Sequence, residues 1–123
     1  MKDDKLYLIH ITECIERIEE YIAGGRDEFM GSSLIQDAVL RNLQTMAEST
    51  QRISYSLKTL HPEVSWRDIS GFRNILVHDY LGLDLEYIWQ AIEHDLPSLK
   101  CQIKTMLEER GRRLEERGKK LQE

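Results

Sequence analysis

Cysteine, proline, glycine and aromatic residues are all scarce in this chain. Among 123 residues there are two cysteines, two prolines and seven glycines, and aromatic residues make up 7%. This composition is typical of a helical protein and argues against a β-sandwich or a disordered chain. Cys14 and Cys101 lie far apart and have no zinc-type spacing, so we expect two reduced thiols within a helical core and a cytoplasmic location.

Long apolar runs and an excess of basic residues are absent as well. The first five residues lack the apolar stretch of a signal peptide, and no segment approaches the length that crosses a bilayer, so we expect no membrane partner. The formal net charge of −5 argues against a broad basic surface for duplex nucleic acid. A small local site for a single RNA strand remains compatible with this charge. The sequence contains no recognised metal or nucleotide motif, and we expect no cofactor and no metal.

In the first half of the chain, apolar residues recur at spacings of three and four, which predicts amphipathic helices. A first helix is expected over residues 4–23 and ends at the glycine pair 24–25, because glycine accepts the left-handed conformation of a helix end. The polar residues 26–32 are interpreted as a loop. Ser33 can then cap a second helix that continues to about residue 60.

Two further helices are predicted in the second half. His61-Pro62 ends the second helix, and Ser65 begins a third that runs to about residue 81. Asp84 can cap a fourth helix, in which Pro97 should produce a kink or split the helix in two. Four such helices with short loops predict an all-α fold, an antiparallel up-and-down bundle.

The C-terminal residues 108–123 differ in composition from the rest of the chain. They are rich in glutamate, arginine and lysine, and their opposite charges nearly cancel. We therefore expect a bundle domain over residues 1–107, followed by a charged and solvated helical tail over residues 108–123. The alternative is a basic strip that touches RNA or a partner, made of Arg110, Arg112, Arg113 and Arg117.

The third helix carries polar, reactive side chains on the face opposite its own apolar stripe. Successive residues turn by about 100° around a helix axis, and with Arg73 at zero the stripe is centred near 260°. The stripe comprises Ile69, Phe72, Ile75 and Leu76. An arc from about −20° to 140° holds the four polar side chains, which are Arg73, Asn74, His78 and Tyr80. Val77 shares that arc, which indicates that a second subunit covers part of this surface.

Each of these polar residues has an ordinary interpretation when it is taken alone. Arg73 would be a surface arginine, His78 a partly exposed histidine, and Tyr80 a packing residue with its hydroxyl at the rim. Asn74 within a helix is mildly unfavourable and requires no function. Because all four share one face of a single eight-residue segment, we favour the functional interpretation.

The segment from Trp66 to Tyr80 resembles the signature of the HEPN superfamily. It is most similar to the HepT-like toxins that are paired with minimal nucleotidyltransferase (MNT) antitoxins. The residues that carry the likeness are Trp-x-x-Ile-x-Gly-x-Arg-Asn at 66–74 and Arg73-x4-His78-x-Tyr80. Residues 37–43 and 96–99 fit the family's second and fourth helices, and the likeness covers most of residues 5–107. One departure is at 45–49, where many relatives carry a glycine that this chain lacks, which affects only local helix packing.

This resemblance implies a HEPN-like bundle that forms a homodimer through the motif-bearing face. Two Arg73/His78 sets would then form one composite cleft for metal-independent cleavage of RNA, supported by Asn74. Imidazole suits proton transfer near neutral pH, and a guanidinium binds phosphate as a fixed fork. The resemblance also implies a cognate MNT-type nucleotidyltransferase antitoxin, which would neutralise the toxin by adding AMP to Tyr80.

Two other functions stay open from the sequence. Some HEPN-like bundles are non-catalytic partners of nucleotidyltransferases, in which case Arg73 and His78 would bind nucleotide phosphate. A plain dimeric helical adaptor, with its polar face buried in an interface, is the third interpretation. A ribonuclease assay of the wild type against His78→Ala separates the enzyme from the binding module.

Overall fold

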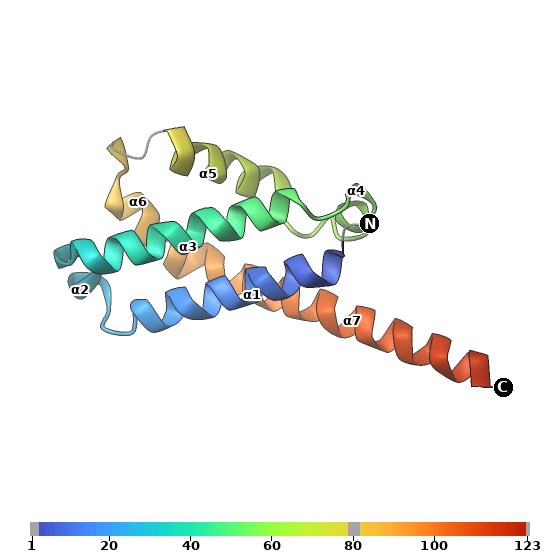
Figure 1. The fold of residues 1–123 in the computed structure, drawn as a ribbon. Helices are drawn as coiled ribbons and strands as arrows, with labels where there is room; N and C mark the ends of the chain where they lie inside the picture. Colours follow the sequence, from blue (N-terminus) through green and yellow to red (C-terminus); the bar gives the residue numbers. More distant parts are fainter. Residues whose placement is uncertain (1–2, 79–81, 123) are drawn as a thin grey trace.

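The regular elements of the protein are helical throughout the part of the chain that the structure describes. The computed structural model describes residues 3–78 and 82–122. Consecutive long helices run in opposite directions, as Figure 1 shows for α1 (Asp4–Tyr21), α3 (Ser33–Gln51) and α5 (Trp66–His78). The predicted all-α, up-and-down architecture is therefore confirmed. No helix within the described ranges is long and apolar enough to cross a membrane.

The connection after α1 is a helix where the sequence predicted a loop. Gly25 has a φ of 90°, a conformation that suits glycine, and α2 (Arg26–Gly31) begins immediately after it. Phe29 is completely buried and anchors this short helix to the core. The side-chain amide of Gln36 donates to the carbonyls of Phe29 and Met30 at 2.9 and 3.1 Å. Residues 26–32 were predicted as a loop because they are mostly polar, and this composition gave no sign that Phe29 is buried in the core.

The second predicted helix consists of two helices. α3 is capped by Ser32, one residue earlier than predicted, through a 3.2 Å bond from the amide of Ile35. The helix ends at Gln51, and a separate helix α4 (Tyr55–Leu60) follows. Ser54 separates them because its hydroxyl accepts from the amide of Leu57 at 3.2 Å while its own amide donates to Asp4 at 2.9 Å. α4 ends at the predicted His61-Pro62 break.

The fourth predicted helix is split just before Pro97. Asp84 caps α6 (Leu85–Gln90) as predicted, through a 3.0 Å bond from the amide of Glu86. A π-helical turn, η2 (Ala91–Asp95), then leads into α7 (Leu96–Gln122). Proline has no N–H and its ring clashes with the carbonyl four residues earlier, and the wider turn accommodates both effects. The amide of Leu96 accordingly donates to the carbonyl of Ala91, five residues back.

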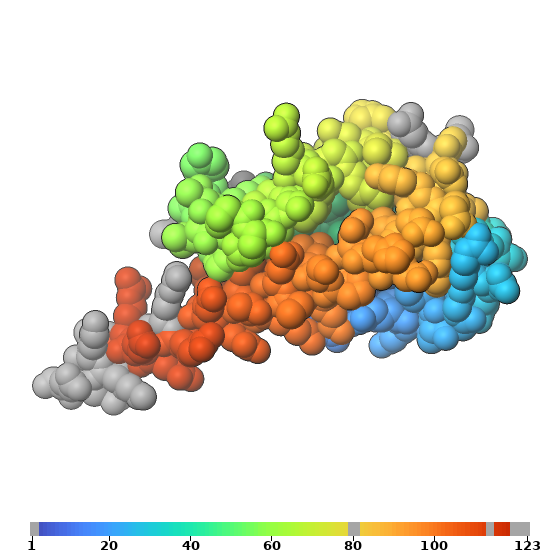
Figure 2. Space-filling view, turned by 180° about the vertical axis from the view of Figure 1, so that it is seen from behind, coloured from blue at the N-terminus to red at the C-terminus, as the bar shows by residue number. Residues whose placement is uncertain are grey.

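The four long helices leave one seam of the bundle open. α1 packs against α3 and α7, whereas α5 packs mainly on α3. Between α5 and the α6–η2–α7 segment lies a groove of about 480 Å³, with Leu43 and Met46 of α3 at its floor. Figure 2 shows this hollow from behind, between the yellow-green and the orange helices. α7 projects beyond the other helices (Figure 1). The boundary at residue 107, between the bundle domain and the charged tail, stays a prediction.

Candidate active site

The start of the motif helix α5 is fixed by its first side chain. The indole N–H of Trp66 donates to the carbonyl of His61 at 3.0 Å, and the ammonium of Lys58 lies 5.7 Å from the centroid of its ring. Burial lowers the pKa of Lys58, whereas Asp4 raises it by a smaller amount. These two contacts therefore hold the start of α5 against the end of α4.

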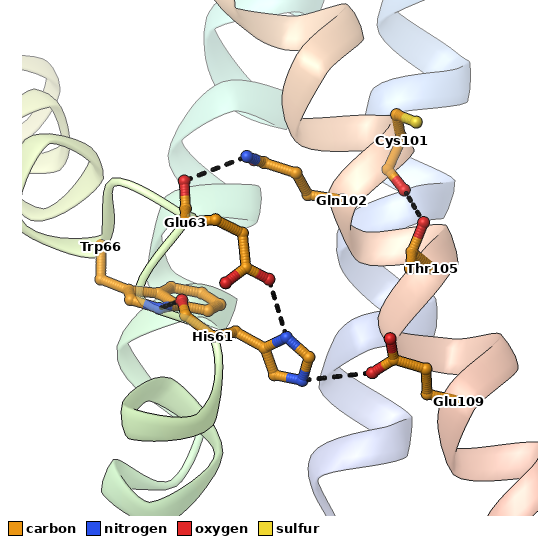
Figure 3. Close-up of polar contacts among 7 residues, drawn as sticks. All are labelled: His61, Glu63, Trp66, Cys101, Gln102, Thr105 and Glu109. Atoms are coloured by element: carbon orange, nitrogen blue, oxygen red, sulfur yellow. Dashed lines mark hydrogen bonds and ion pairs between the residues drawn. The ribbon is translucent and has the colours of Figure 1, made fainter.

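His61 ties this connection to α7, as Figure 3 shows. The ring is buried, with Nδ1 lying 2.8 Å from Oε1 of Glu63 and Nε2 lying 3.7 Å from Oε2 of Glu109. The side-chain amide of Gln102 donates to the carbonyl of Glu63 at 3.1 Å. A hydrogen bond from its own backbone amide, and then the His61 ring, lower the pKa of Glu63. From the sequence, His61 is predicted only as part of a helix break.

The predicted site residues differ in their exposure on α5. Asn74 and His78 are exposed, and His78 is the last residue of the helix. Arg73 is half-buried, and its Nε is a buried atom to which no described group is hydrogen-bonded. Among the described residues, no hydrogen bond or ion pair joins these three side chains. Tyr80, the predicted modification site, lies outside the described residues.

The predicted core stripe of α5 is only partly covered. Leu76 is the buried member, at 2% exposure, while Ile69, Phe72 and Ile75 are half-buried. Val77, on the reactive arc, is 37% exposed. The open groove accounts for Ile69 and Phe72, which line it, because α7 does not pack on α5 as extensively as it packs on α1.

The groove beside α5 has an aromatic wall and a polar rim that no local sequence pattern predicts. The rings of Phe72 and Tyr87 lie with centroids 6.1 Å apart and planes inclined at 46°. The rim includes the side chains of Asp68, Gln90, His94, Asp95 and Gln102. Two carboxylates in the rim disfavour phosphate there, so we keep this groove separate from the Arg73/His78 surface.

The two cysteines differ from the prediction in one respect. Both thiols are free, and Cys14 is completely buried as expected. Burial raises the pKa of Cys14, which keeps it protonated. Cys101 is exposed, so its predicted place in the core is wrong. No cluster of three or more metal-binding side chains is found in the described residues.

Comparison with known proteins extends the likeness beyond the motif. A Methanocaldococcus jannaschii protein named "Gamma-glutamylcyclotransferase and putative RNase MJ0434" is 36% identical over 88% of this chain. This chain spans 49% of the length of that relative. A Thermococcus cleftensis protein named as a probable ribonuclease HepT is 37% identical over 80% of this chain and 91% of its own length. The mRNA nuclease HepT of Shewanella oneidensis is 26% identical over 70% of this chain and 82% of its own. No solved structure matches the chain.

The family comparison covers most of the bundle. The family described as "Ribonuclease HepT-like" matches residues 11–106, from the middle of α1 to the part of α7 that packs on it. The match includes Trp66, Arg73 and His78, on which the resemblance was founded. This chain therefore belongs to the HepT-like ribonuclease family.

Proposed function

We propose that this chain is a metal-independent endoribonuclease, the toxin of a HEPN/MNT-type toxin–antitoxin pair acting in the cytoplasm. The observation that carries the proposal is the exposed position of Asn74 and His78 on a helix face that the described residues do not cover. Arg73 lies one residue before this exposed pair, and the chain belongs to a ribonuclease family. The relative from Shewanella oneidensis is named an mRNA nuclease, which supports RNA as the substrate.

The chemistry of this proposal needs only proton transfer and charge stabilisation. RNA carries its own nucleophile, the 2′-hydroxyl. His78 of one copy would take the proton of that hydroxyl as its oxygen bonds to the adjacent phosphorus. The partner's His78 would give a proton to the departing 5′-oxygen as its bond to phosphorus breaks. The products are a 2′,3′-cyclic phosphate and a 5′-hydroxyl, and no external reactant is consumed.

Arg73 is suited to hold the reacting phosphate. Arg73 is half-buried, and its Nε is a buried donor to which no described group is hydrogen-bonded, so this nitrogen remains available to a ligand. A fixed fork of donors binds a phosphate in two places and binds more tightly as negative charge develops. Asn74 would orient the phosphate or an imidazole from the same helix face.

A second copy of the chain would complete the site. α5 leaves Ile75 half-buried and Val77 37% exposed beside the reactive residues. Covering such apolar side chains favours association, and a two-fold axis supplies a second histidine and arginine to the same cleft. We therefore infer a homodimer.

The proposal includes control by a cognate MNT-type nucleotidyltransferase. Tyr80 follows His78 by two residues, and an AMP group on its hydroxyl would add negative charge and bulk near Arg73. Both effects would oppose RNA binding. Co-expression with the antitoxin should add the mass of AMP to the wild type and not to Tyr80→Phe, and an adduct found on another residue would contradict this assignment.

The decisive experiment is cleavage of labelled RNA by the purified wild type in the presence of EDTA. We expect cyclic-phosphate ends, and loss of cleavage by about 10²-fold or more in His78→Ala, because general acid–base catalysis contributes this much. His94→Ala is the matched control, since His94 is also exposed and lies in the groove. Cleavage that EDTA abolishes would overturn the proposal. Intact RNA together with ATP binding that Arg73→Ala abolishes would support the nucleotide-binding partner instead.

A further inference from the structure

The groove between α5 and the α6–η2–α7 segment carries acidic groups in its rim and no lysine or arginine. Its acidic and basic lining side chains, within the part of the chain that the structure describes, are Asp68, Asp95 and His94. Both aspartates are exposed. No described group forms an ion pair or a side-chain hydrogen bond with either carboxylate. The two carboxylates are therefore available to a cation that comes from outside the described chain.

Below this rim the groove is apolar. Its floor consists of buried side chains, which are Leu43, Met46, Leu96 and Leu99. One wall holds the paired rings of Phe72 and Tyr87, and Tyr87 is 48% exposed. An aromatic face attracts a cation as well as apolar groups. The volume of about 480 Å³ is typical of sites that bind ligands. The groove is therefore complementary to a group that is both apolar and positively charged.

The π-helical turn η2 keeps the opposite wall in line with the groove. Tyr87, Ala91, Asp95 and Leu99 line the groove at intervals of four residues. In a continuous α-helix each such interval drifts by about 40° around the axis, so three intervals would spread these side chains over about 120°. A π-helical turn contains more residues than an α-helical turn, which takes up part of this drift. Such turns occur frequently at functional sites, and this one shapes a wall of the groove.

The shape and the charge of the groove together select its occupant. Helices form its floor and both walls, and the hollow is open to the surface in Figure 2. Along α5 the lining residues run from Ser65 to Phe72, roughly 10 Å or two helical turns. Two turns of an amphipathic helix present apolar anchors at spacings of three and four, which is the usual mode of helix-in-groove recognition. The phosphates of RNA and anionic lipid headgroups are repelled by Asp68 and Asp95.

We infer that this groove is a docking site for a basic amphipathic helix of a partner protein. Apolar anchors of that helix pack on the floor, and its lysine or arginine side chains pair with Asp68 and Asp95. On α5 the groove-lining Asp68 and Phe72 lie about 100° or more from Asn74 and His78 around the helix axis. A bound helix therefore leaves the exposed face of α5 open. The inference is independent of whether the chain cleaves RNA.

Selection from a random peptide library on the immobilised full-length chain tests the chemistry of the partner. We expect enriched peptides with apolar residues at spacings of three and four, flanked by lysine or arginine. For these peptides the dissociation constant should rise by about tenfold or more in Asp68→Lys/Asp95→Lys, because attraction becomes repulsion. Glu108→Lys/Glu115→Lys is the matched control, since both residues are exposed on α7 beyond the groove. It carries the same change of charge and should alter the dissociation constant by less than about threefold.

A second variant tests the apolar part of the groove and does not depend on charge. Ala91 lines the groove and is half-buried, so Ala91→Phe should fill the space and weaken the same peptides, whereas Ala23→Phe, at an exposed position, should not. Circular dichroism should show equal helix content, and if Ala91→Phe fails to fold, the charge variants decide. No enrichment, acidic or uncharged peptides, or equal binding by both lysine variants would overturn the inference. Self-association that Asp68→Lys/Asp95→Lys abolishes would assign the groove to a second copy and overturn it as well. These readouts need no RNA, so a failure here leaves the proposed function to its own assay.

Discussion

Replacing His61 by alanine should destabilise the fold by removing a buried link between two parts of the bundle. The ring is 8% exposed and lies between carboxylates of Glu63 and Glu109, at 2.8 and 3.7 Å. Alanine removes the ring and both of its contacts with the two carboxylates. The backbone carbonyl of residue 61 remains, so the 3.0 Å bond from Trp66 can persist.

The size of the effect follows from these contacts. Both carboxylates are partly exposed, with side-chain exposures of 54% and 37%, so water screens the electrostatic part of the two contacts strongly, and that part contributes little to stability. The lost packing of the ring and its one short hydrogen bond dominate. We expect the free energy of unfolding to fall by about 1–3 kcal/mol, the range for losing a buried polar contact with its packing.

Urea unfolding followed by circular dichroism measures this change. His94→Ala is the control, because His94 is exposed, and its free energy of unfolding should change by less than about 0.5 kcal/mol. Hydrogen exchange should show faster opening at the start of α5, where Trp66 is anchored, than in α1. An unchanged free energy of unfolding in His61→Ala would refute the reasoning that this side chain links α4 and α5 to α7.

Three further predictions concern acid stability, the core and the site. The ion pair with Arg26 lowers the pKa of Glu86, so its stabilisation is present at neutral pH and is lost as the pH falls below about 4.5; Glu86→Gln should flatten this acid dependence in unfolding titrations. Phe29→Ala should reduce the free energy of unfolding by about 3–5 kcal/mol in urea, because the ring is completely buried and packs on Trp89 at 5.4 Å. Arg73→Lys should retain the fold and lose RNA cleavage, since lysine offers no rigid fork; full activity would exclude a bidentate role.

The sequence predicted those helices whose limits are set by residues close to them in the chain. The apolar periodicity predicted α1, and Asp84 and Pro97 marked the start of α6 and the split before α7. The break between α3 and α4 was missed because the cap of Ser54 on Leu57 lies within a continuing apolar pattern and because its second support lies 50 residues away in the chain, where Asp4 accepts a 2.7 Å hydrogen bond from the hydroxyl of Ser54. Periodicity continues across such a break, since it reports only which positions are apolar.

Periodicity also identified the apolar face of α5 without showing how much of it is covered. Ile69 and Phe72 are half-buried and line the groove that stays open between α5 and the α6–η2–α7 segment. The coverage of a face depends on the neighbouring helices, which a single segment does not encode. The candidate site was therefore predicted as a set of residues on α5, whereas the His61 link and the groove beside Phe72 became visible only in three dimensions.

The charge of the molecule constrains how the proposed site can hold RNA. With a formal net charge of −5, the chain repels a polyanion at long range, so attraction must come from a few groups at short range. Arg73 is suited to this because its half-buried guanidinium acts at contact distance, where screening by salt is weak. A dimer doubles the number of these arginines in one cleft, but it also doubles the surrounding negative charge. Cleavage should therefore depend weakly on ionic strength, in contrast to proteins that grip nucleic acid through a broad basic surface. A steep loss of cleavage between 50 and about 200 mM salt would point to a basic strip elsewhere, for which the arginines of α7 are the candidates.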